Sequence, residues 1–291
     1  MDYQAVIIIG APRSGTNMLR DVVCRLDGFG TWPCDEINCI WRYGNSDSET
    51  DVFAPVQATP PVKHYISGRF ERLAQSRNLA VVVEKTCANA LRLPFVASVL
   101  PEARYVWIHR DPVDCVASAI KRWEAPMDWR YTLRKARFIP LTDLPFYGWR
   151  FLRNRAQRLL SGEGQVAVWG PVYEGMAQDL AEGTVLDVCA IQWKECIEKT
   201  TAGLCEMAPE QWMAVSYENF VRKPVRHLSG ICEFLGLPDV AEGLGAAVDG
   251  VSAASIGKGR AELGTERARQ IEVLVAPATA ALAAMPDMRA A

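Results

Sequence analysis

The chain has 291 residues, a length that allows one large α/β domain or two smaller ones. Apolar residues make up 49% and charged residues 23% of the sequence, proportions that exclude a disordered chain, a collagen-like repeat and a coiled coil. The 32 Lys and Arg residues nearly balance the 34 Asp and Glu residues, and the net charge of −2 argues against a nucleic-acid partner attracted by overall positive charge.

Short apolar, β-branched runs alternate with helical patterns along most of the chain. We predict strands at residues 5–10, 30–32, 79–84, 104–109 and 212–217, and helices at residues 17–26, 90–100, 112–123, 223–235 and within the tail, 239–291. Continuous Val and Ile runs between helices are typical of a parallel sheet buried on both faces. The sequence therefore predicts a single α/β domain over residues 1–291, with ligands bound beyond the carboxyl ends of its strands.

Residues 123–185 interrupt this alternation and are predicted to be an insertion. Ten of the 51 residues from 123 to 173 are aromatic, and residues 104–158 carry 12 Lys or Arg against 5 Asp or Glu. One interpretation is a lid whose aromatic faces and cations receive a sugar or an anionic acceptor. The other is a helical subdomain with its own aromatic core and a solvated basic face, and the sequence leaves both open.

The cysteines and the chain's start bear on where the protein works. The nine cysteines include no C-x-x-C pair and only three histidines are present, which argues against a structural zinc site and favours buried, reduced thiols. No secretory signal precedes the first predicted strand, and no apolar stretch reaches the ~20 residues of a membrane span. We therefore expect a cytoplasmic protein without a membrane span.

The first predicted strand runs into the loop GAPRSGTN, which is followed by a helix. Glycines let backbone N–H groups crowd onto an anion, and a helix N-terminus adds a positive dipole, so this loop is a predicted phosphate cradle. It departs from the nucleotide-triphosphate loop, because Thr16 and Asn17 stand where Lys and Ser or Thr would reach a γ-phosphate and Mg²⁺. These departures argue against an ATP-dependent kinase and favour an anion site without a metal. Its predicted binding residues are Arg13, Ser14, Gly15, Thr16 and Asn17.

The strand, this loop and the helix together resemble the 5′-phosphosulfate loop of the sulfotransferases that use 3′-phosphoadenosine 5′-phosphosulfate (PAPS). A second feature agrees, since the family binds the cofactor's 3′-phosphate with an Arg at a strand end and a Ser two helical turns on. Arg110 and Ser118 have this spacing. The resemblance is to the branch with Arg in the first loop, which includes bacterial and protein-tyrosine sulfotransferases. It implies a sulfotransferase domain whose fold is like that of the P-loop NTPases.

Two further blocks carry the resemblance towards the end of the chain. Residues 216–220 with Pro224 resemble the family's strand–loop–helix block, where Tyr217 either packs or lines the nucleotide site. Residues 255–260 look like the late loop that closes over the cofactor, where Lys258, Gly259 or Arg260 would meet a phosphate. A solvated turn is the alternative for this last segment.

The resemblance also implies the reacting groups. Sulfuryl transfer, like phosphoryl transfer, needs cations on the transferring and leaving groups and a base for the acceptor. We assign the phosphosulfate clamp to Arg13, sulfuryl stabilisation to Lys85, which ends a predicted strand, and the base to Glu36. Asp35 and His109 stay open as alternative bases.

The expected reaction is therefore transfer of the sulfuryl group of PAPS to an acceptor hydroxyl, with no metal. The acceptor we favour is a carbohydrate or glycan, and a phenolic, tyrosine or lipid acceptor is the alternative. Two other classes remain in competition, namely an ATP-dependent small-molecule kinase and a binding module that has lost its chemistry. We expect no nucleic-acid partner.

Overall fold

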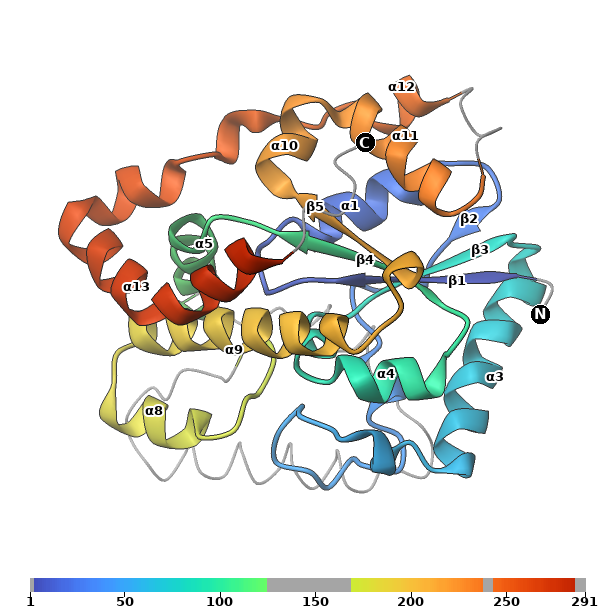
Figure 1. Cartoon of the computed structure of the whole chain (residues 1–291), viewed down its shortest axis with the longest axis horizontal. Helices are drawn as coiled ribbons and strands as arrows, with labels where there is room; N and C mark the ends of the chain where they lie inside the picture. Colours follow the sequence, from blue (N-terminus) through green and yellow to red (C-terminus); the bar gives the residue numbers. More distant parts are fainter. Residues whose placement is uncertain (1–2, 125–168, 238–242, 286–291) are drawn as a thin grey trace.

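A five-stranded parallel sheet in the order β2-β3-β1-β4-β5 lies at the centre of the molecule (Figure 1). The structure is a computed structural model that describes residues 3–124, 169–237 and 243–285. The strands are β1 (Gln4–Ile9), β2 (Phe29–Gly30), β3 (Val81–Lys85), β4 (Arg104–His109) and β5 (Trp212–Ser216). The predicted single α/β domain with a parallel sheet is thereby confirmed.

Both faces of the sheet are buried, as the continuous apolar runs predict. In β1, Val6 and Ile8 pack into one hydrophobic cluster, whereas Ile7 and Ile9 pack into the other. Side chains alternate between the faces of a strand, so a run of apolar residues supplies both clusters at once.

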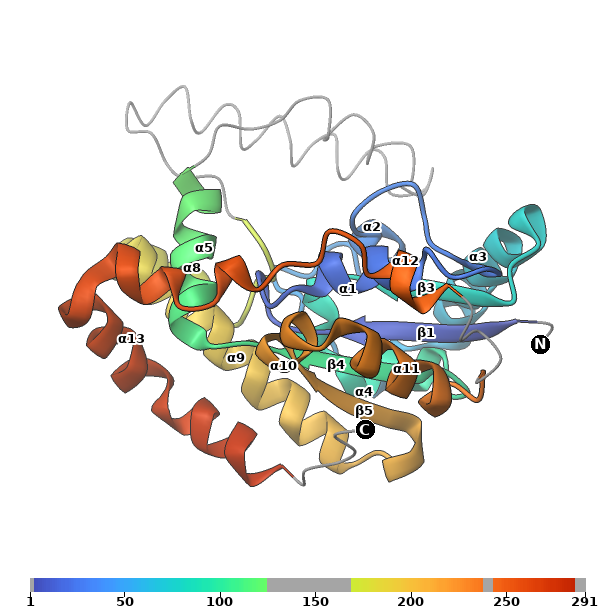
Figure 2. The same cartoon turned by 90° about the horizontal axis from the view of Figure 1, so that it is seen from above.

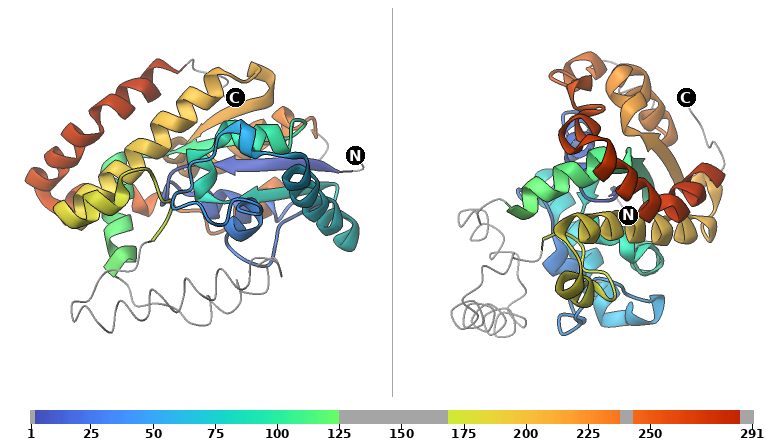
Figure 3. Two further views of the ribbon diagram at one scale, coloured as in Figure 1. Left: turned by 90° about the horizontal axis from the view of Figure 1, so that it is seen from below. Right: turned by 90° about the vertical axis from the view of Figure 1, so that its left-hand side faces the viewer.

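One set of helices covers each face. The face of Val6 is covered by α1 (Thr16–Val23), α10 (Tyr217–Arg222), α11 (Pro224–Phe234) and α12 (Leu244–Ala247), seen in front of the sheet in Figure 2. The opposite cluster draws on α2 (Asn38–Trp41), α3 (Pro60–Arg77), α4 (Leu93–Val99), α5 (Pro112–Glu124), α8 (Met176–Glu182), α9 (Val185–Cys205) and α13 (Lys258–Ala284). Helix α13 packs along α9 and α5 (Figure 3).

Short 3₁₀ turns connect several of these elements. They are η1 (Pro55–Gln57), η2 (Cys87–Leu91), η3 (Pro209–Gln211) and η5 (Ala253–Ser255). The single helix predicted at residues 90–100 is two elements in the structure, because η2 occupies its start and α4 begins only at Leu93. Pro94 stands in the first turn of α4, where a missing N–H is tolerated, and it therefore marks a helix start.

The other boundaries differ from the predictions by a few residues. The strand predicted at residues 30–32 is β2, which is only two residues long and lies at the edge of the sheet. The described part of the tail is mostly helical, in α12, η5 and α13, and α13 is kinked at Gly264, whose backbone is not helical. Most of the predicted insertion, residues 125–168, lies outside the described residues, and its end contributes α8 and the preceding loop.

Since all five strands are parallel, their carboxyl ends meet at one edge of the sheet. The predicted phosphate loop leaves β1 there, and Lys85, Arg110 and Tyr217 come from the ends of the three neighbouring strands or the residues just after them. The topology thus gathers most of the predicted site residues, which are spread over two hundred positions of sequence.

Candidate active site

The loop between β1 and α1 is a tight turn that requires glycine. Gly15 has a φ of 92°, and a Cβ at this position would collide with the ring of Tyr217. Arg13 also has a positive φ, 68°, which is uncommon for a residue with a side chain. Helix α1 starts directly after Gly15 with no acidic residue in its first turn, so its N-terminal N–H groups offer a positive end to an anion.

The side chains of the loop point in two directions. The hydroxyls of Ser14 and Thr16 face inward, 3.6 Å from the Sγ of Cys115 and 3.7 Å from the Sγ of Cys87 respectively. Burial raises the pKa of both thiols to about 12, so they stay neutral and leave the electrostatics of the loop to its backbone and to Arg13. Arg13 and Asn17 are exposed.

The structure brings Arg13, Arg110 and Ser118 together beside this loop. The Nε of Arg13 donates to the Oγ of Ser118 at 2.8 Å, and Nη1 of Arg110 donates to the carbonyl oxygen of Arg13 at 3.2 Å. The guanidinium of Arg110 lies 4.2 Å from the ring centroid of Tyr217. Tyr217 therefore supports both the phosphate loop, through Gly15, and Arg110.

Asp114 joins the late segment to this group. Its carboxylate accepts from the backbone N–H groups of Gly257 and Gly259, at 2.8 and 2.7 Å, and pairs with Arg110 at 3.4 Å. Nη2 of Arg110 also donates to the carbonyl oxygen of Ser255 at 2.7 Å. Residues 255–260 thus lie against Arg110, with Lys258 exposed at the start of α13.

Lys85 and Glu36 form the second group. The Nζ of Lys85 lies 2.9 Å from Oε1 of Glu36, which also accepts from the backbone N–H of Cys87 at 3.4 Å. The Lys85 side chain is 2% exposed and that of Glu36 is 24% exposed. Burial alone would lower the pKa of Lys85, but the adjacent Glu36 carboxylate outweighs it and the pKa is raised. Lys85 is therefore a buried, permanently charged ammonium held by a carboxylate that reaches solvent.

The neighbouring carboxylate, Asp35, is placed differently. Arg20 donates to its backbone oxygen at 3.0 Å and lies 3.6 Å from its carboxylate. Arg20 also pairs with Asp21 at 2.7 Å, so the charged neighbours of Asp35 are two residues of α1, Arg20 and Asp21. Of the two adjacent acids, Glu36 is the one in contact with Lys85.

The sequence also matches a known protein family. A family described as the sulfotransferase family matches residues 5–167 and 152–242, which together span well over half of the chain. The chain belongs to the sulfotransferase family. No match was found among curated proteins.

Solved structures agree on the fold of this sulfotransferase. A sulfotransferase from Mycobacterium avium aligns with a TM-score of 0.51 at 11% identity, covering 99% of this chain and 79% of the other. A sulfotransferase from Mycobacterium tuberculosis H37Rv aligns with a TM-score of 0.50 at 13% identity, covering 95% of this chain and 77% of the other. Identities this low support the fold alone. The conclusion that the chain is a sulfuryl-transferring enzyme rests on the family match.

Two polar residues of the candidate site, Asp114 and Glu218, were missed by sequence reasoning. Asp114 holds the late segment, and Glu218 accepts from the backbone N–H of Asp111 at 3.0 Å and from the hydroxyl of Ser216 at 3.0 Å, so it ties the ends of β4 and β5 together. Asp114 stands four residues after Arg110, the spacing of a helical ion pair, and this signal could have found it.

His109, the alternative base, ends β4 with its ring 5.5 Å from that of Trp107. Burial lowers the pKa of His109, so its imidazole is neutral near pH 7.

Two features are absent from the described residues, 3–124, 169–237 and 243–285. Within these ranges no three His, Cys, Asp or Glu side chains are grouped so that they could hold a metal ion. None of the described helices has both the length and the apolar character to cross a bilayer.

Proposed function

We propose that this sulfotransferase takes the sulfuryl group from PAPS and transfers it, without a metal, to a hydroxyl of a carbohydrate acceptor. The observation that carries the choice of donor is the convergence of Arg13, Arg110 and Ser118 beside the phosphate loop. A second anion site next to the first suits a nucleotide that carries phosphate at both its 5′ and 3′ positions.

The hydrogen bonding of the Arg110 side chain supports its proposed binding to the 3′-phosphate. Its guanidinium is buried, its Nε has no hydrogen-bond partner among the described residues, and two of the groups it contacts are neutral carbonyl oxygens. A buried donor without a partner is unfavourable, and a phosphate oxygen would satisfy it with a charge-assisted bond. Arg110 and Ser118 would hold the 3′-phosphate, and the loop from Arg13 to Asn17 would hold the 5′ end.

The reacting end of the site is assigned to Glu36, Lys85 and Arg13. When bound, PAPS supplies an activated sulfuryl group. Glu36 would take the proton of the acceptor hydroxyl on a carboxylate oxygen, because this side chain is the one of the pair that reaches solvent. The Lys85 ammonium and the Arg13 guanidinium would stabilise the negative charge that develops on the transferring and leaving oxygens.

The choice against ATP rests on the loop itself. Thr16 faces inward to Cys87 and Asn17 occupies the place of the hydroxyl that would bind Mg²⁺. The carbohydrate acceptor is supported by the aromatic and basic composition of residues 123–173, most of which lie outside the described residues. The nine free cysteines support a reducing, cytoplasmic setting.

Calorimetry tests the donor. We expect adenosine 3′,5′-diphosphate to bind more tightly than adenosine 5′-phosphate, because only the former engages Arg110. Arg110→Ala should weaken binding of the diphosphate by roughly 10- to 100-fold and remove this preference. Arg25→Ala is the matched control, since Arg25 also donates to two carbonyl oxygens but lies on another surface.

The acceptor is tested separately by a screen of sugars, phenols and lipids with labelled PAPS. Tighter binding of ADP with Mg²⁺ than of adenosine 3′,5′-diphosphate would replace the proposal with a kinase. Tight diphosphate binding without transfer to any acceptor would point to a binding module.

A further inference from the structure

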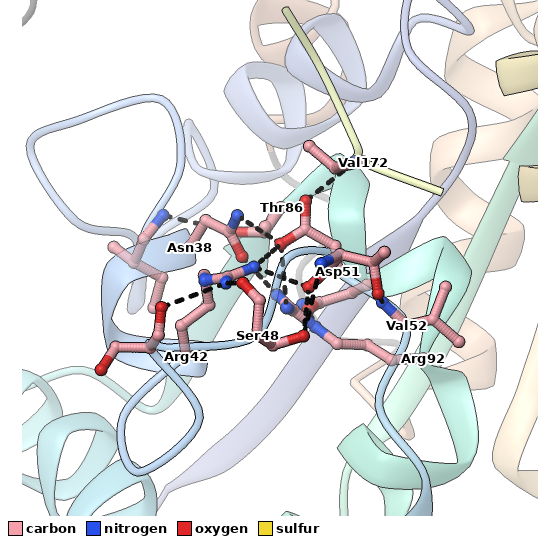
Figure 4. A network of polar contacts seen from close by, with 12 residues as sticks. Asn38, Arg42, Ser48, Asp51, Val52, Thr86, Arg92 and Val172 are labelled. Carbon is pink, nitrogen blue, oxygen red and sulfur yellow. Dashed lines mark hydrogen bonds and ion pairs between the residues drawn. The ribbon is translucent and has the colours of Figure 1, made fainter. Parts of the chain in front are cut away.

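A buried polar network joins the chain just after Glu36 to the strand that carries Lys85, and Figure 4 shows the part of it around Asp51, Arg92 and Thr86. At one end is Asp51, whose side chain accepts from Arg42 at 2.7 Å and from Asn38 at 3.1 Å. Its other oxygen accepts from the backbone N–H of Val172 at 2.9 Å, and Arg92 lies 3.6 Å away. Asn38 is two residues after Glu36, so this end of the network holds the segment that carries the proposed base.

From there the network runs to the strand that carries Lys85. Arg92 donates through Nη2 to the side-chain oxygen of Asn38 at 2.5 Å and through Nε to that of Asn89 at 3.0 Å. Asn89 in turn donates to Oε2 of Glu84 at 3.0 Å. Glu84 immediately precedes Lys85 and is 0% exposed.

Thr86 closes the network into a ring. Its hydroxyl donates to Oε1 of Glu84 at 2.5 Å and accepts from the backbone N–H of Ile37 at 3.2 Å. Glu84 and Thr86 are the residues on either side of Lys85, and Ile37 is the residue directly after Glu36. One hydroxyl therefore bridges the two segments that bring Lys85 and Glu36 to 2.9 Å.

The network is charged and, apart from the half-buried Asn38, its side chains are buried, which makes it costly to disturb. Burial would raise the pKa of Asp51, but Arg92 and Arg42 outweigh it and the pKa is lowered, so Asp51 is ionised. Burial raises the pKa of Glu84 to about 7, although the Thr86 hydroxyl opposes the shift. Thr86 and Asn89 each donate to the carboxylate of Glu84, and such bonds reduce the cost of burying it in this interior.

We propose that Thr86 is a positioning residue, which fixes the separation of Glu36 and Lys85 by joining the chain after the first to the strand of the second. Its importance for catalysis rests on the roles proposed for Glu36 and Lys85. The hydroxyl touches neither of their side chains in the described hydrogen bonds and acts through Glu84 and the backbone of Ile37.

Thr86→Val tests this inference, because it keeps the shape of the side chain and removes both hydrogen bonds. We expect kcat to fall by about tenfold or more, while the dissociation constant of adenosine 3′,5′-diphosphate changes by less than about twofold. Thr86→Ser restores the hydroxyl and should recover most of the lost kcat. Thr201→Val is the matched control, since Thr201 is also buried and its hydroxyl bonds only within α9.

A crystal structure of Thr86→Val gives a readout that does not need turnover. We expect the Lys85 Nζ to Glu36 Oε1 distance to exceed the roughly 4 Å of an ion pair. An unchanged distance of 2.9 Å would overturn the inference, whatever reaction the enzyme catalyses. Absence of transfer from PAPS by the wild type would instead contradict the proposed function and leave this distance as the deciding measurement.

If Thr86→Val does not fold, Glu84→Gln takes its place, because the amide keeps the size of the side chain but replaces one of the two oxygens that accept from Thr86 and Asn89 with an NH2 group, which cannot accept. The same loss of kcat without loss of diphosphate affinity is expected. Equal falls in kcat for this variant and for Thr201→Val would assign the network to stability alone.

Discussion

The two sides of the phosphate loop differ in how their cations are satisfied. On the side of β3, Lys85 is held by the carboxylate of Glu36 at 2.9 Å. On the side of β4, Arg110 donates to the carbonyl oxygens of Arg13 and Ser255, and its ion pair with Asp114 is a longer 3.4 Å. The first side is a close ion pair, whereas on the second the shortest bonds of Arg110 go to neutral carbonyl oxygens, which under the proposed function a phosphate would replace.

This contrast separates two tasks. A pair that is already neutral and firmly held contributes little attraction to an incoming dianion but presents its groups in a fixed geometry, which favours the chemical step. Donors that exchange neutral oxygens for phosphate oxygens contribute to affinity. Variants on the β3 side should therefore change kcat, and variants on the β4 side should change the affinity for the donor.

The largest effect is expected for Lys85→Ala. Loss of the ammonium removes charge stabilisation at the transferring group, and kcat should fall by about 10³-fold. Binding of adenosine 3′,5′-diphosphate should change by less than about tenfold, because this product lacks the sulfuryl group. Steady-state kinetics with labelled PAPS and calorimetry measure the two quantities, with Lys63→Ala on the exposed side of α3 as control.

If Lys85→Ala lost as much diphosphate affinity as kcat, the two sides of the phosphate loop would not differ in function. Lys85 would then be a donor-binding residue like Arg110.

The next effect is expected for Glu36→Gln, which keeps the side-chain shape and removes the basic oxygen. We expect kcat to fall by about 10²-fold with diphosphate affinity unchanged. Asp35→Asn is the matched control one position away, since Asp35 lies against Arg20 rather than Lys85. A larger fall for Asp35→Asn than for Glu36→Gln would move the base to Asp35.

The fold was predictable because its signals are local. The apolar β-branched run that becomes β1 and the glycines of the following loop each specify their own conformation from the sequence nearby. The start of α4 was not predicted, because the helical pattern from residue 90 concealed the separate turn η2. Only Pro94 marked the boundary.

The site was predictable only in part. Arg13 was predicted from the loop motif and Arg110 and Ser118 from the resemblance to the sulfotransferases, and the structure brings the three side by side, while their roles stay predictions. The bond of Thr86 to Ile37 was not predicted, since a hydrogen bond across 49 residues depends on how two loops pack and leaves no pattern in the sequence. The same is true of Asp51, whose role follows from contacts with three separate segments, namely α2 with its C-cap residue Arg42, the segment of Arg92 and the loop of Val172.

The smallest effect is expected for Ser118→Ala. This variant tests whether Arg13 acts mainly in donor binding, like Arg110, or in the chemical step, like Lys85. Ser118 accepts from Arg13, which we assign both to the phosphosulfate clamp and to the reacting end. Loss of one neutral acceptor should weaken diphosphate binding by about three- to tenfold and leave kcat within about twofold. Ser98→Ala is the control, because Ser98 is also a half-buried helical serine with one hydrogen bond, to the carbonyl oxygen of Pro94.

The change in kcat of Ser118→Ala, compared with its change in diphosphate affinity, decides whether Arg13 acts in the chemical step or in donor binding. A fall in kcat greater than the loss of affinity would mean that Ser118 aims Arg13 at the transferring group rather than at the bound phosphates. The reacting side would then extend across the phosphate loop, from the Lys85 and Glu36 pair to a guanidinium held from α5, and the division between affinity and chemistry would lie between Arg13 and Arg110.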